Sequence, residues 1–147
     1  NYQPGPFLNL NGEIIGTHRG IPFYTIGQRR GLNLAAGERL YVVRIDAENN
    51  TITLGPEKAV FGKCLRAEEA NLILFEEMPG KIEVEAQVRY NGRPARAILE
   101  AIDGSALQVC FLSPQRSITP GQSVVFYLGD YLVGGATIEE SLNNREL

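Results

Sequence analysis

The sequence predicts a mainly β protein built from two small domains, a β-rich domain over residues 1–62 and a β-barrel of six strands or so over residues 63–147. Short runs of alternating apolar and polar residues follow one another closely, and Asn-Gly or Asp-Gly pairs separate several of them. These pairs supply the positive φ angles that tight hairpins need. Glycine and charge interrupt the pattern near Gly62 and Lys63, where we place the domain boundary.

The first domain is expected to contain two strand pairs. Its predicted strands are 7–10, 13–15, 40–45 and 51–54. The turns between them are Asn11-Gly12 and the polar segment 46–50. Helix signals are weak, and we expect at most one short helical turn, capped by Thr25 and ending at Gly31.

Hairpin turns organise the second domain. Its predicted strands are 81–88, 95–102, 106–111, 123–127 and 131–133. Asn91-Gly92, Asp103-Gly104 and the segment 128–130 provide the turns between neighbours. Thr119-Pro-Gly-Gln122 has the residue order of a type II turn, with proline at the second position and glycine at the third. Residues 61–74 are too mixed to assign.

Composition is that of a soluble globular protein, with 44% apolar residues, 21% charged residues and a net charge of −3. No apolar run reaches the roughly 18 residues of a membrane span and no signal peptide is visible, so we expect a cytoplasmic protein without membrane contact. Cys110 is expected to be a buried thiol and Cys64 a structural or incidental one. With one histidine in the chain, a zinc site is not expected.

Two basic segments stand out against this acidic background. Residues 16–31 lie within an acid-free stretch between Glu13 and Glu38, and residues 87–98 also lack acids. Their basic residues are His18, Arg19, Arg29 and Arg30 in the first segment and Arg89, Arg93 and Arg96 in the second. Arginine with aromatic neighbours suits phosphates and bases of RNA, whereas ordinary surface charge on a glycine-rich loop explains the pattern equally well.

Three further side chains are candidates for RNA contact. Arg89 and Tyr90 end a strand before the turn Asn91-Gly92, so a planar cation and a stacking ring are held at a hairpin end. Gln122 follows a rigid turn and offers both a donor and an acceptor. The alternatives are a surface arginine beside a core tyrosine, and a turn that merely begins a strand.

Six segments of the chain, taken in order, resemble the tRNA-specific 2-thiouridylase family. They are Gly12–Gly20, Phe23–Leu32, Tyr41–Val43, Val88–Tyr90, Ile118–Tyr127 and Gly134–Ile138. The resemblance covers nearly the whole chain and two of the segments are long. Arg30, where the family often has lysine, keeps the charge. Asn33, where glycine is common, tolerates the left-handed conformation.

The resemblance implies a central domain followed by a barrel similar to those of translation factors, which together hold a tRNA with a wobble uridine. It assigns tRNA contact to Arg89, Tyr90 and Gln122, and closure of the active site or tRNA contact to His18, Gln28, Arg29 and Arg30. Family members thiolate C2 of that uridine. ATP with Mg²⁺ and the catalytic cysteines then belong to a domain upstream of Asn1, and a sulfur-relay protein supplies persulfide sulfur.

On this interpretation the chain itself holds no catalytic residue, no metal and no cofactor, and acts only within the intact enzyme. An alternative from another class is a stand-alone β-barrel module that binds RNA or a translation protein without catalysis. The missing catalytic motifs favour that alternative, and the order of the six segments favours the first.

Overall fold

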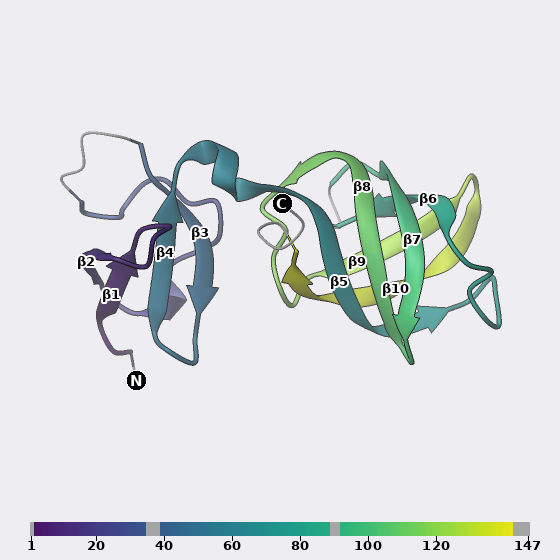
Figure 1. Cartoon of the computed structure of the whole chain (residues 1–147), viewed down its shortest axis with the longest axis horizontal. Helices are drawn as coiled ribbons and strands as arrows, with labels where there is room; N and C mark the ends of the chain where they lie inside the picture. The colour runs from purple at the N-terminus through teal and green to yellow at the C-terminus, as the bar shows by residue number, and fades with distance from the viewer. Residues whose placement is uncertain (1, 35–38, 89–91, 143–147) are drawn as a thin grey trace. The chain divides into compact units, whose positions relative to one another are not determined.

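A computed structural model describes residues 2–34, 39–88 and 92–142 (Figure 1). The chain forms two compact units, Asn1–Phe61 and Gly62–Leu147, which divide beside the boundary proposed from the sequence. Each unit has its own apolar core.

The first unit contains a four-stranded sheet in the order β2-β1-β4-β3. Its strands are β1 (Gly5–Leu8), β2 (Ile14–His18), β3 (Tyr41–Asp46) and β4 (Thr51–Gly55). Both predicted antiparallel pairs form, and β1 joins them by pairing parallel to β4. Two 3-10 turns, η1 (Ile21–Phe23) and η2 (Glu57–Val60), complete the unit.

The helical turn expected from Thr25 to Gly31 does not form. The Gln28 amide donates to the Thr25 carbonyl at 3.0 Å, which closes one reverse turn. Gly27 (φ +94°) and Gly31 (φ +77°) then leave the helical region, so the helix cannot continue. The segment instead pairs with the start of β3, because Gly27 donates to the Val42 carbonyl and the Val42 amide to the Gln28 carbonyl, at 2.8 and 2.9 Å.

The second unit is a closed six-stranded barrel in the order β10-β5-β8-β7-β6-β9, which confirms the predicted architecture. Its strands are β5 (Phe61–Leu72), β6 (Ile82–Gln87), β7 (Ala95–Asp103), β8 (Ala106–Arg116), β9 (Ser123–Leu128) and β10 (Tyr131–Ser141). Figure 1 shows these strands wrapping around one another. Closure leaves no unpaired sheet edge.

Strand β5 is the element that the sequence did not reveal. Leu65 and Ala67 are fully buried while Arg66 and Glu68 face outward, so the alternation is present. It is short, however, because Glu69 adopts φ +55° and interrupts the regular extended backbone. Strand β10 is longer than predicted for a similar reason, because it continues past register shifts that break the sequence pattern. Strand β8 also extends beyond its predicted end, to Arg116.

Cys64 and Cys110 form a disulfide, which corrects the prediction of two free thiols. They lie 46 residues apart in sequence, but β5 and β8 are neighbours in the barrel. Cys110 sits between Val109 and Phe111, which point into the core, so the bond lies on the outer face. The alternation was read correctly, but the assignment of Cys110 to the inner face was wrong.

Candidate nucleic-acid interface

The basic loop of the first unit presents Arg29 and Arg30 to solvent. The Gln28 side chain fixes the turn behind them, since its Oε1 accepts from the Thr25 amide at 3.0 Å and its Nε2 donates to the Arg30 carbonyl at 2.8 Å. Both arginine side chains are exposed, and neither has an acidic partner within the part of the chain that the structure describes. Gln28 therefore braces the loop, and the two arginines are available to an anion.

His18, predicted in the same group, lies inside the first unit and is fully buried. Its Nε2 lies 2.9 Å from the Asn50 carbonyl, and its Nδ1 accepts from the Gly20 amide at 3.0 Å. These partners require the neutral ring with the proton on Nε2. Phe7 and Tyr24 pack edge to face against it. His18 is thus a packed residue of the first unit, and direct contact with RNA would require this packing to open.

The two aromatic residues of the basic segment take opposite positions. Tyr24 is buried, and its hydroxyl accepts from the Arg19 amide at 3.0 Å. Phe23 is 46% exposed, with the Arg19 guanidinium 4.5 Å from its ring centroid and Tyr2 packed against its edge. Arg19 is thus partly engaged by a cation-π contact, unlike Arg29 and Arg30.

In the barrel, the turn before Gln122 forms as predicted. Gly121 has φ +90°, and the Gln122 amide donates to the Thr119 carbonyl at 3.3 Å, as a type II turn requires. Gly121 and Gln122 also bond through their backbones to Ile138 of β10, at 2.8 Å each. The turn is therefore fixed to the barrel wall.

The Gln122 side chain is less exposed than expected. Its Oε1 is buried and has no hydrogen-bond partner among the described residues. Buried acceptors are normally paired, so this oxygen can accept one hydrogen bond from a hydroxyl, an amine or a water that reaches it.

Arg89 and Tyr90 lie outside the described residues, but the strand before them is well placed. Gln87, at the end of β6, is opposite Val125 near the start of β9. The ends of β6 and β8 and the start of β9 therefore meet at one end of the barrel, which also carries Gln122. The sequence alone could not place these segments together, because strand order is not readable from it.

The second basic segment is only partly available to an anion. The Arg96 guanidinium contacts the Glu83 carboxylate across β6 and β7 at 2.6 Å, and its Nε donates to the same carboxylate at 2.8 Å. Arg93 is exposed and has no acidic partner among residues 2–34, 39–88 and 92–142. A run without acids in the sequence is thus not a surface without acids.

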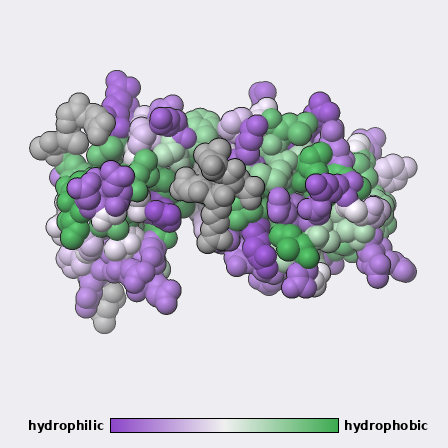
Figure 2. Space-filling model, in the orientation of Figure 1, coloured by the Kyte–Doolittle hydropathy of each residue, from purple (hydrophilic) through white to green (hydrophobic). Residues whose placement is uncertain are grey.

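Elsewhere on the barrel, Arg66 is neutralised by two carboxylates. It contacts Glu68 at 2.8 Å and Glu139 at 3.2 Å. Hydrogen bonds with Glu139 and then with Arg66 lower the pKa of Glu68. Hydrophilic side chains are spread over the displayed face of both units, so hydrophilicity by itself does not distinguish a site (Figure 2).

Two negative findings apply to the described residues. No three histidine, cysteine or acidic side chains among them are grouped as a metal site would need. None of their helical segments has the length and apolar character to cross a bilayer.

Comparison with known proteins divides the chain as the structure does. Residues 1–56 match the family described as the tRNA methyl transferase PRC-barrel domain, and residues 62–138 match the aminomethyltransferase beta-barrel domain. The chain is 66% identical over 95% of its length to the tRNA-specific 2-thiouridylase MnmA of Pelotomaculum thermopropionicum, and 57% identical over 97% to that of Desulforamulus reducens. It spans 38% and 39% of the lengths of these relatives.

Proposed function

Since the chain belongs to the tRNA-specific 2-thiouridylase family, we propose that it is a tRNA-holding part of such an enzyme. The observation that carries the proposal is 66% identity over 95% of the chain to a relative whose name specifies action on tRNA. The exposed, acid-free pair Arg29 and Arg30 supports it, because unpaired arginines are the groups that bind backbone phosphates.

Within this proposal, the first unit contacts the tRNA backbone through Arg29 and Arg30, and Gln28 keeps both in place. The barrel contributes Gln122, whose unpaired Oε1 suits a ribose hydroxyl or a base amine once the side chain turns out of its buried position. Arg89 and Tyr90 remain predictions that rest on the family resemblance.

The chemistry of a whole 2-thiouridylase, thiolation of C2 of the wobble uridine with ATP and a persulfide donor, is proposed for the longer protein and not for these 147 residues. The described residues do not fit ATP, because their helices are single 3-10 turns and no glycine loop leads from a strand into an α-helix. We therefore assign ATP, Mg²⁺ and the sulfur-relay partner no residue in this chain.

The direct test measures binding of the chain to an unmodified tRNA transcript with a wobble uridine at several salt concentrations. Replacing both Arg29 and Arg30 by alanine should weaken binding and reduce the slope of log affinity against log salt by about 0.7 to 0.9 per lost phosphate contact. Arg44→Ala, an exposed arginine of β3 in the same unit, is the matched control and should change the slope less. An unchanged slope in the double variant would contradict the proposal.

A second test uses the full-length enzyme. Gln122→Ala should reduce tRNA thiolation more than it reduces ATP turnover measured without tRNA. Equal losses in both activities would point to a folding defect and would remove Gln122 from the proposed interface.

A further inference from the structure

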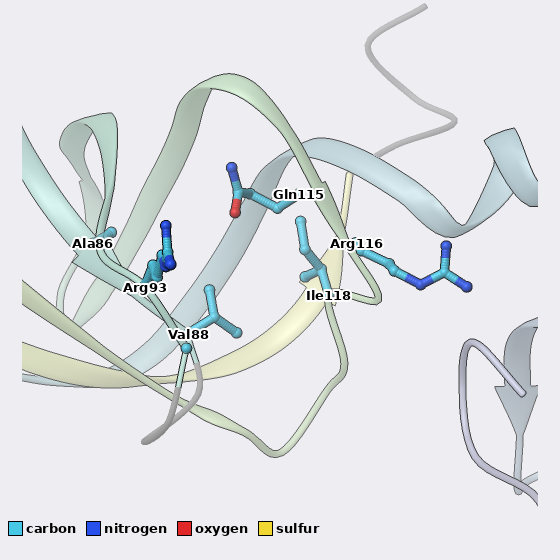
Figure 3. A pocket seen from close by; sticks show the side chains of 7 residues that line it. Ala86, Val88, Arg93, Gln115, Arg116 and Ile118 are labelled. Atoms are coloured by element: carbon cyan, nitrogen blue, oxygen red, sulfur yellow. The ribbon is translucent and has the colours of Figure 1, made fainter.

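A pocket of about 180 Å³ lies at the barrel end that carries Gln122 (Figure 3). It is formed by the end of β6, the residues that precede β7, and the end of β8 with the residue that follows. Its lining residues are Ala86, Val88, Gly92, Arg93, Gln115, Arg116 and Ile118. The pocket is smaller than the roughly 300 Å³ at which sites for drug-sized ligands begin, so it suits one small planar group.

One side of the pocket is apolar and belongs to the barrel core. Ala86 and Ile118 are 1% and 6% exposed, and Val88 packs against the same core cluster. Because this wall is part of the packed core, it offers an apolar contact whose side chains do not have to be ordered when a ligand arrives.

The opposite side is polar and cationic. Arg93 and Gln115 extend beside the apolar wall, whereas the Arg116 guanidinium points away from the other labelled side chains (Figure 3). Gln115 Nε2 donates to the Ser113 carbonyl at 3.0 Å, which holds the amide in place. No carboxylate lines the pocket. The acid nearest in register, Glu85, is opposite Arg96 on β7 and is not a lining residue, and Glu83 is bound to Arg96.

We propose that this pocket binds one unstacked nucleotide of the tRNA, a contact that rests on the proposed function and deepens it. The base lies against Val88 and Ile118, the Gln115 amide bonds to the edge of the base, and Arg93 binds the adjoining phosphate. A free phosphate would leave the apolar wall unused, and an apolar ligand would make no use of Arg93 or of the Gln115 amide oxygen. A nucleotide uses both sides.

The proposal also specifies which part of an RNA is bound. A base can enter a pocket of this size only when it is free of stacking and pairing, as in a loop or a bulge. The barrel end therefore binds single-stranded nucleotides and not the duplex stems.

The experiment uses the whole chain with two probes, heptauridine and an abasic heptamer with the same number of phosphates. The wild-type chain should bind heptauridine about tenfold more tightly than the abasic probe, since stacking and edge contacts are lost without the base. Gln115→Ala should lower heptauridine affinity about fivefold and leave the abasic probe unaffected.

Arg93→Ala should weaken both probes equally and reduce the salt slope by about 0.7, the value for one phosphate contact in a single strand. Arg96→Ala, the neighbouring arginine paired with Glu83, is the control and should leave both affinities unchanged. Gln115→Glu provides a second variant of equal size. Its carboxylate should weaken the binding of both probes, because it repels their phosphates.

Two results separate this proposal from the proposed function. If the chain binds the tRNA transcript but binds both heptamers equally, or if neither Gln115 variant changes binding of heptauridine, the pocket proposal is overturned and the tRNA-holding function stands. If the chain does not bind the transcript, both are overturned, and an acidic protein segment becomes the better partner for Arg93.

Discussion

The two units treat their basic segments differently. In the first unit, the residues of one continuous segment differ in their burial. His18 is buried, Gln28 braces a turn, and the Arg29 and Arg30 side chains are exposed to solvent. In the barrel, the difference lies in cross-strand ion pairing, because Arg96 binds Glu83 diagonally across β6 and β7 while Arg93 lies beyond the paired region. A cluster of cationic residues in a sequence therefore defines an interface only after burial and cross-strand pairing have removed some of its members.

The largest effect on stability should come from the disulfide, which links two strands of the barrel and has no counterpart in the first unit. Reducing the Cys64–Cys110 disulfide should lower the free energy of unfolding of the barrel by about 2–4 kcal/mol, because the unfolded chain loses a loop constraint. Urea unfolding of each unit, followed residue by residue by NMR, measures this directly.

The double variant Cys64→Ser with Cys110→Ser is the control, and the reductant should not change its stability. The first unit should unfold at the same urea concentration in the wild-type chain and in the double variant, with and without reductant. A loss of stability in the first unit instead of the barrel would contradict the separation of the two units.

Replacing His18 by alanine should destabilise the first unit by about 2–4 kcal/mol, since it leaves a cavity and removes the partners of Asn50 and Gly20. Thr17→Ala, an exposed neighbour on β2, should have little effect. If His18→Ala left stability unchanged but weakened tRNA binding, His18 would contact the tRNA directly. Burial would then not have removed it from the interface.

The ion pair between Arg96 and Glu83 should contribute little to stability because both side chains are substantially exposed. Arg96→Ala is expected to cost about 0.2–1 kcal/mol in thermal unfolding. It should leave tRNA affinity unchanged, in contrast to Arg93→Ala. A loss of affinity as large as that of Arg93→Ala would show that cross-strand pairing does not withdraw an arginine from the interface.

The smallest effect should be the pH dependence of the Arg66 cluster. Folding lowers the pKa of Glu68, so its contribution is present above its ordinary value of 4.5 and is lost as the pH falls through the lowered pKa. Unfolding midpoints of wild type and Glu68→Gln should therefore differ slightly at neutral pH and converge in acid. A difference that grows in acid would contradict the lowered pKa of Glu68 in the folded protein.

Local rules predicted the parts of the fold that depend on a few adjacent residues. Gly12, Gly104 and Gly121 have the positive φ angles that their turns required, and the strands on either side of them form. The rules missed β5, because the Glu69 conformation interrupts its alternation. The Thr25 helix was expected from its cap, but backbone pairing with Val42 replaced it.

The site was only partly predictable. Arg29 and Arg30 are exposed as a basic loop suggests, whereas the burial of His18 depends on Phe7, Tyr24 and Asn50, which come from elsewhere in the unit. The pocket formed by Arg93, Gln115 and Ile118 had no sequence signal, because its walls come from separate strand ends.

The sequence by itself determined the β architecture, the hairpin turns and the family, because these depend on residue order and local backbone preference. Only the tertiary structure decided which cysteines bond, which arginines are neutralised and which polar groups meet at the barrel end. Barrel closure is the physical reason: it fixes strand order and register, and these bring together residues such as Cys64 and Cys110 that are 46 positions apart.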